Sequence, residues 1–146
     1  MNRIIIAIAA SVLSHLLLFG TLVITTRALP SRVASHFGAA GIPDGWMSRS
    51  TYLATMTGFS AGVTLVLLFV FYCVRYFPDA AMNLPNRDYW LAPSRRAATL
   101  AAIFRFCLWL TCLNACFIFG IHLLVVDANR SQPAQLSAGI WVLGAC

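Results

Sequence analysis

Three long apolar segments, separated by polar connections, set the pattern of this chain. Residues 4–26, 52–74 and about 99–126 are almost entirely apolar, and arginines flank the first two segments. A helix of about 20 residues, at ~1.5 Å rise per residue, covers the ~30 Å hydrocarbon core of a bilayer. Each segment is therefore predicted to be a transmembrane helix. A cleaved signal peptide is the alternative for the first segment, but its apolar run is longer than such peptides carry.

The end of the chain changes character twice. Residues 128–133 read as a polar turn, and residues 136–146 are apolar again but too few to cross a bilayer. This tail either lies in the membrane interface or begins a fourth helix, and its apolar end favours the second reading. The predicted fold is thus all-α, a polytopic transmembrane helical bundle of three spans plus a partial fourth. Residues 1–126 form the three-helix domain, with connections at 27–51 and 75–98, and residues 127–146 follow it.

Composition supports a membrane protein without catalytic chemistry. The chain is 60% hydrophobic and only 10% charged, all ten basic residues are arginine, and all four acidic residues are aspartate. Because four carboxylates provide few groups for acid–base catalysis, we expect neither an enzyme nor a cofactor. The arginines flank apolar runs instead of forming a patch with interleaved aromatic residues, which argues against nucleic-acid binding despite the net charge of +6.

The distribution of arginines favours a cytoplasmic N-terminus under the positive-inside rule. That orientation places five arginines inside and four outside. The inner set is Arg3, Arg75, Arg87, Arg95 and Arg96, and the outer set is Arg27, Arg32, Arg49 and Arg130. Three tyrosines near the ends of the second span, Tyr52, Tyr72 and Tyr76, are expected in an interfacial aromatic belt.

The first connection carries turn chemistry and a short alternating segment. Pro43-Asp44-Gly45 is typical of a turn, because proline presets φ and glycine accepts positive φ, and two further glycines at 38 and 41 allow a reversal just before it. Alternation between residues 33 and 37 indicates an extended strand. We expect a small hairpin lying on the outer membrane face, anchored by Phe37 and Trp46.

Both connections contain motifs that resemble the bacterial SdpI-like membrane proteins, with their short domain of unknown function. In the first connection the matching residues are Leu29, Pro30, His36, Phe37, Gly41, Pro43, Asp44, Gly45, Trp46, Ser48 and Arg49. In the second they are Leu84, Pro85, Asn86, Tyr89, Trp90, Leu91, Ala92, Pro93, Arg95 and Arg96. The resemblance implies a bacterial inner-membrane protein with the first motif outside and the second inside. In well-understood relatives the role is immunity to a secreted peptide toxin, coupled to sequestering a repressor at the membrane.

Four residues raise the question of metal or haem binding. His36 and Asp44 could share a metal ion, but two ligands do not make a site, and hydrogen bonding within the loop is the preferred interpretation. His15 and His122 could hold a haem between two spans. Their predicted depths in the membrane differ, so His15, with Ser11 one turn before it, is instead expected to hydrogen-bond into a helix interface.

Other polar and small residues in the spans predict helix packing. Ala54, Gly58 and Gly62 form a small-residue stripe on the second span, which is expected to pack against another span, with homo-dimerisation as the alternative. Asn114 lies at mid-membrane and requires a partner on another helix.

Two hypotheses of function follow. The first is a non-enzymatic integral membrane protein that binds partners through its two motif loops, as immunity or signalling proteins do. The second is an accessory or structural subunit of a larger membrane complex. A cofactor-carrying protein using His15 and His122 is a third, weaker alternative. The expected partners are the lipid bilayer and either another membrane protein or a second copy of the chain.

Overall fold

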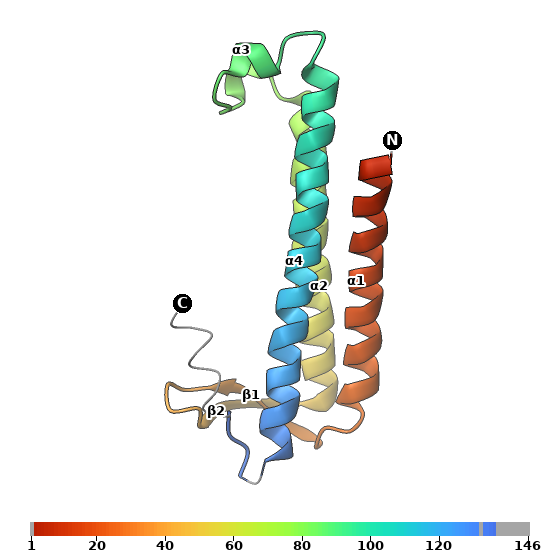
Figure 1. Cartoon of the computed structure of the whole chain (residues 1–146). Helices are drawn as coiled ribbons and strands as arrows, with labels where there is room; N and C mark the ends of the chain where they lie inside the picture. The colour runs from red at the N-terminus through yellow and green to blue at the C-terminus, as the bar shows by residue number, and fades with distance from the viewer. Residues whose placement is uncertain (1, 132, 137–146) are drawn as a thin grey trace.

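Three long helices run side by side through the computed structural model, which describes residues 2–131 and 133–136 (Figure 1). They are α1 (Asn2–Thr26), α2 (Arg49–Cys73) and α4 (Arg96–Arg130). Three segments are long and apolar enough to cross a membrane, and they are Arg3–Thr26, Arg49–Tyr76 and Arg96–Arg130. The three predicted spans are therefore confirmed. The proposed start of a fourth helix was residues 136–146, and all of these except Leu136 lie outside the described part of the chain.

The all-α prediction needs correction, because the first connection forms a small sheet. Strands β1 (Arg32–Phe37) and β2 (Pro43–Ser48) pair antiparallel as a hairpin. The alternation before Phe37 indicated the first strand correctly, but Pro43-Asp44-Gly45 is not the turn; it lies within β2. The chain reverses over residues 38–42, where Gly41 has a φ of 70° and the Gly38 amide donates to the Ile42 carbonyl at 2.9 Å.

The last helix is longer than predicted. It continues to Arg130, so the polar turn expected over residues 128–133 is wrong for residues 128–130. Polarity alone does not end a helix, and the first proline after the apolar run comes only at Pro133. The side chain of Asn129 donates to the Val125 carbonyl one turn earlier and also reaches the sheet.

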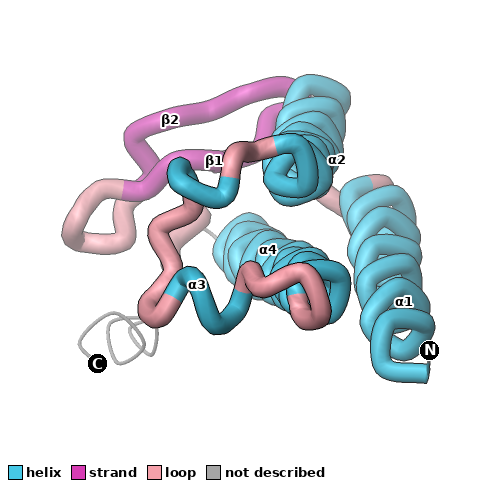
Figure 2. The backbone as a smooth tube through the Cα atoms, turned by 90° about the horizontal axis from the view of Figure 1, so that it is seen from above, coloured by secondary structure: helices cyan, strands magenta, loops and turns pink. Residues whose placement is uncertain are grey.

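The hairpin and the second connection lie at opposite ends of the bundle (Figure 1). The hairpin lies where α1 ends, α2 begins and α4 ends. At the other end the chain forms η1 (Val74–Tyr76), η2 (Asp79–Ala81) and the short helix α3 (Arg87–Trp90). Viewed down the helices, the hairpin extends to one side of the three-helix triangle (Figure 2).

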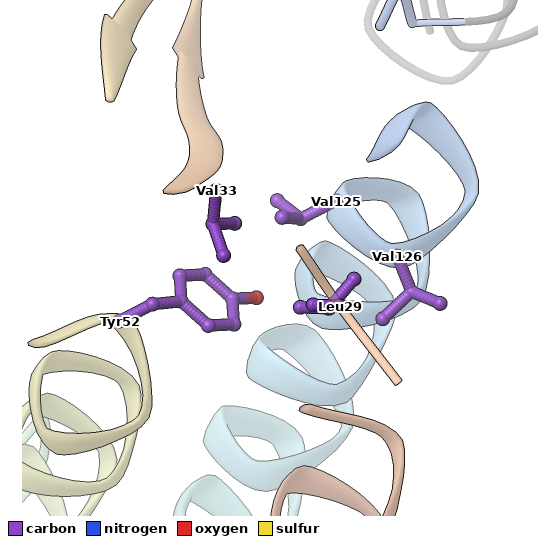
Figure 3. Packing of buried hydrophobic residues seen from close by; sticks show 5 residues of the cluster. All are labelled: Leu29, Val33, Tyr52, Val125 and Val126. Atoms are coloured by element: carbon purple, nitrogen blue, oxygen red, sulfur yellow. The ribbon is translucent and has the colours of Figure 1, made fainter. Parts of the chain in front are cut away.

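A compact apolar cluster joins the hairpin to the helices. Leu29, Val33, Tyr52, Val125 and Val126 are all buried and come from the α1–β1 connection, β1, α2 and α4 (Figure 3). Tyr52 is only 2% exposed. Its expected place in an aromatic belt is therefore wrong, whereas Tyr72 and Tyr76 at the other end of the span are exposed.

Beside this cluster, a hydrogen-bonded chain connects all three helices through His122. Thr25 of α1 donates its only hydroxyl proton to the Thr21 carbonyl, so it must accept from Nε2 of His122. In the neutral imidazole Nδ1 is then an acceptor, and the Tyr52 hydroxyl of α2 donates to it at 2.8 Å. The fully buried ring thus has both nitrogens satisfied and one defined tautomer.

A second chain, nearer the middle of the helices, is centred on His15. Its Nδ1 donates to the Ser11 carbonyl at 2.8 Å, so its Nε2 accepts from the Thr64 hydroxyl of α2, also at 2.8 Å. Thr64 in turn accepts from the side-chain amide of Asn114 on α4 at 3.3 Å. Asn114 thus has the partner on another helix that its depth required.

A further bond from Ser11 completes the link between α1 and α4. Thr111 donates to the Leu108 carbonyl, so it accepts from the Ser11 hydroxyl, at 2.7 Å. Helices surrounded by lipid gain no hydrophobic free energy by touching one another, so packing and interhelical hydrogen bonds fix their register. The two histidine-centred chains supply such bonds at two levels of the bundle.

We predict that Tyr52→Phe destabilises the fold by about 1–2 kcal/mol, because Nδ1 of His122 loses its donor in a buried site. Thermal unfolding of the purified protein in mild detergent measures the change. Tyr76→Phe is the matched control, since it deletes the same hydroxyl from an exposed tyrosine. Equal unfolding temperatures for the two variants would contradict the assigned network.

Candidate binding surfaces at the two ends of the bundle

The side of the hairpin turned away from the bundle forms the first candidate surface, which we call the hairpin outer face. It consists of Arg32, His36, Ile42, Asp44 and Trp46, all of them exposed. Ile42 is 60% and Trp46 45% exposed, and the Arg32 guanidinium lies 5.6 Å from the centre of the Trp46 ring. The face combines an aromatic ring, an aliphatic side chain and charged groups on one rigid support.

His36 and Asp44 are bonded to each other across this face, through Nδ1 and a carboxylate oxygen. The register shifts on either side of His36 leave Ser35 and Asp44 without partners, which brings Asp44 next to the histidine. Gly45 is required opposite His36, since a Cβ there would lie 2.8 Å from the His36 Cβ. The loop hydrogen bond expected for His36 is thus made to Asp44 itself.

The opposite side of the hairpin fixes it to the bundle. Phe37 and Met47 are partly buried against the apolar cluster, so Phe37 anchors the hairpin from the inside while Trp46 faces outward. Gly41 is buried, and its carbonyl accepts from the Leu136 amide at 3.0 Å. Pro30 is exposed, and Pro43 is half-buried.

Two polar contacts fix the edge and base of the sheet. The Asn129 side chain accepts from the Ala34 amide and donates to the Ala34 carbonyl, each at 2.9 Å, so that it occupies the outer edge of β1. Arg49 donates to the Arg27 carbonyl at 2.7 Å and thereby joins the end of α1 to the start of α2. The sheet is therefore hydrogen-bonded to α4 at its edge, and the chain segments that enter and leave it are joined at its base.

The second candidate surface, the Tyr-Trp loop, surrounds α3 at the other end. Tyr89 and Trp90 are both exposed and meet edge to face, and the Arg95 guanidinium lies 4.0 Å from the Tyr89 ring centre. Thr99 donates to the Trp90 carbonyl at 2.8 Å, and Asn86 begins α3 in the left-handed region.

Arg96 contributes to the structure of the second connection. It donates to Asp79 at 3.1 Å and to the Arg75 carbonyl at 3.4 Å, which holds η2 against the start of α4. Arg95 and Arg96, adjacent in the motif, thus make different contacts: one stacks on an exposed ring and the other ties two segments together.

The structure brings each motif together internally but keeps the two apart, at opposite ends of the helices (Figure 1). The small-residue stripe is not packed as expected. Ala54, Gly58 and Gly62 are exposed, and within the described residues no atom lies within 4 Å of a Cβ built on either glycine. Gly58 and Gly62 line an apolar groove together with Phe59 and Val66.

The haem alternative does not fit the histidine geometry. All four ring nitrogens of His15 and His122 are engaged in hydrogen bonds within the bundle. His15 and the Thr25 partner of His122 are also ten residues apart on α1, which corresponds to about 15 Å along the helix. Among the described residues there is no group of three or more potential metal ligands.

Several important residues escaped the sequence analysis. Asn129 lay in a segment read as a turn, and His122 drew attention only as a haem ligand. Thr25 and Thr64 lie in predominantly apolar segments, and nothing around them indicated that their hydroxyls bond to histidines. The sequence does show polar residues inside each span. Such residues require hydrogen-bond partners, but the sequence does not indicate which residues those partners are.

We expect Asn129→Ala to loosen the hairpin while leaving the helices assembled, because two buried backbone groups of Ala34 lose their partner, at a cost of about 1–3 kcal/mol. Hydrogen exchange of the β1 amides reports this as lost protection. Asp127→Ala, an exposed position in the same turn of α4, serves as the control. Unchanged protection in Asn129→Ala would show that the edge contact is dispensable.

Comparison with known proteins gives one match. A family model described as a domain of unknown function (DUF1648) matches residues 13–59. No curated protein and no solved structure matches the chain. The matched segment runs from within α1 through the hairpin and past Tyr52. It contains both strands, the hairpin outer face and two of the three residues of the His122 chain, Thr25 and Tyr52. Over this segment the protein is similar to a domain of unknown function. The chain that contains the segment has three helices long and apolar enough to span a membrane.

Proposed function

We propose that this protein is a non-enzymatic integral membrane protein that binds partner proteins through the hairpin outer face and the Tyr-Trp loop. The SdpI-like resemblance suggests the kind of role: immunity to a secreted peptide toxin, or signalling across the inner membrane. The observation that carries the proposal is the exposure of Trp46 on a hairpin that is firmly bonded to the bundle.

The chemistry of the hairpin outer face suits a protein ligand. Tryptophan and arginine are enriched in binding hot spots, and here Arg32 stacks on Trp46. Ile42 adds an apolar contact at the tip, and the His36–Asp44 pair supplies polar groups beside it. Because the backbone beneath is held in place, little conformational entropy is lost when a partner binds.

The Tyr-Trp loop offers a second surface of similar kind. Tyr89, Trp90 and Arg95 are exposed together, and aromatic residues with an adjacent arginine are typical of interface cores. A partner at each end would let the chain connect events on the two sides of a membrane, as expected of an immunity or signalling protein.

In this proposal the protein lies in the bacterial inner membrane with its N-terminus in the cytoplasm, so that the hairpin is outside and the Tyr-Trp loop inside. We expect a membrane-impermeant maleimide to label Trp46→Cys in intact cells, in a background without the native cysteines. Tyr89→Cys should react only after permeabilisation. The reverse labelling pattern would show that the N-terminus lies outside the cell.

An accessory or structural subunit is the second candidate function. It is favoured by the exposed Ala54, Gly58 and Gly62 stripe, because small residues at intervals of four allow another transmembrane helix to approach closely. In that case the partner contacts the helix inside the membrane and not the loops at its ends.

Site-specific photocrosslinking distinguishes the two functions. With a benzophenone amino acid at Trp46 or Tyr89, the proposal predicts discrete crosslinked protein bands in living bacterial cells. Position 59, beside the stripe, reports on an accessory role. Leu16, a similarly exposed side chain on α1, is the control for random membrane encounters.

Crosslinks at Phe59 alone would favour the accessory subunit and refute loop binding. Bands at Trp46 and Tyr89 that are no stronger than those at Leu16 would also refute partner binding through the loops. If the role is immunity, Trp46→Ala should also abolish protection against the cognate peptide toxin while the level of protein in the membrane stays unchanged.

A further inference from the structure

At the end of the bundle opposite the hairpin, the three helices do not close on one another. A cleft of about 380 Å³ lies between the start of α1, the end of α2 and the start of α4. Ile4, Phe71, Ala101 and Phe104 are among its apolar lining residues. α2 and α4 extend beyond the start of α1 at this end (Figure 1).

One cation accompanies this apolar lining. Arg75 lines the cleft, with its guanidinium 4.0 Å from the centre of the Tyr72 ring. In the part of the chain that the structure describes, Arg75 takes part in no ion pair, whereas nearby Arg96 is paired with Asp79. The positive charge beside the cleft is therefore available to an anion.

The position of Arg75 matches the boundary of a bilayer. It lies one residue before the end of the apolar segment Arg49–Tyr76, where phospholipid headgroups meet the hydrocarbon core. The apolar lining continues from there along α2 and α4 into the span. A ligand that fills this cleft must be apolar along most of its length and anionic at one end.

We propose that the cleft binds one anionic phospholipid, with an acyl chain between α1, α2 and α4 and the phosphate bound by Arg75. Its volume falls within the range of about 300–1,000 Å³ found for small-molecule sites. Guanidinium groups recognise phosphate with charge-assisted hydrogen bonds, and basic pockets between transmembrane helices bind lipid headgroups. This inference depends on the three helices crossing a bilayer and not on the proposed protein partners.

The test measures bound lipid directly. The full chain is reconstituted in vesicles of equimolar phosphatidylglycerol and phosphatidylcholine, extracted in mild detergent and examined by native mass spectrometry. We expect one retained phosphatidylglycerol per chain, in preference to phosphatidylcholine. Arg75→Gln should lower this retention about tenfold, and Arg75→Lys should restore part of it.

Two further variants separate the cleft from general surface charge. Ala101→Phe fills the cleft without changing charge, at an exposed position where a larger side chain disturbs no packed interior, and it should also abolish retention. Arg95→Gln is the matched control, because Arg95 stacks on Tyr89 at the same 4.0 Å but does not line the cleft. Retention in Arg95→Gln should stay at the level of the unaltered chain.

Three results would overturn the proposal. Both lipids carry a phosphate and only phosphatidylglycerol has a net negative charge, so equal retention would refute selection of an anionic lipid. Full retention in Ala101→Phe would place the lipid elsewhere. A dimer that replaces the lipid and disappears in Ala101→Phe would show that the cleft binds a second copy of the chain. Thermal unfolding of each variant verifies its fold, and Ala101→Phe keeps the test valid if Arg75→Gln does not fold.

Discussion

Hydrogen bonds between helices in an apolar surrounding are the constraint on which this structure depends. Apolar side chains that face lipid gain nothing by moving to face another helix, so they leave rotation and register of the helices undetermined. His122 and His15 remove that freedom. Each bonds through both ring nitrogens, and each defines one tautomer through the fixed direction of its partners. Any rotation of one helix would leave several polar groups without partners in a medium that offers no water.

The hairpin depends on the same constraint. The Tyr52 hydroxyl donates to His122, and the Tyr52 ring packs in the cluster that supports Val33 of β1. The position of the first strand is thus set by the register of α2 against α4, and Asn129 then completes its outer edge. The exposed Trp46 is therefore placed by residues far from it in sequence. A surface held in this way is suited to recognition, because it is ordered before a partner arrives.

The two ends of the bundle differ in how completely they close. At the hairpin end an apolar cluster and a buried histidine fill the space between the helices. At the other end α1 starts short of its neighbours, and a cleft lined in part by Arg75 remains. The closed end presents a rigid protein surface, and the open end has the properties of a lipid site. This difference between the ends follows from helix lengths and from where the polar side chains lie.

The sequence by itself determined the three spans, since length and apolar content are local properties, and it indicated the first strand through the alternation before Phe37. It indicated a reversal at Gly38 and Gly41, which the structure confirms, and also a turn at Pro43-Asp44-Gly45, which lies within β2. Both segments have turn chemistry, and only strand register separates them. Tertiary structure alone decided that Tyr52 is buried, that the Gly58 stripe is exposed and that Asn129 completes a sheet. The physical reason is that these outcomes depend on contacts between residues 49 to 95 positions apart, and no local pattern specifies which polar groups will meet.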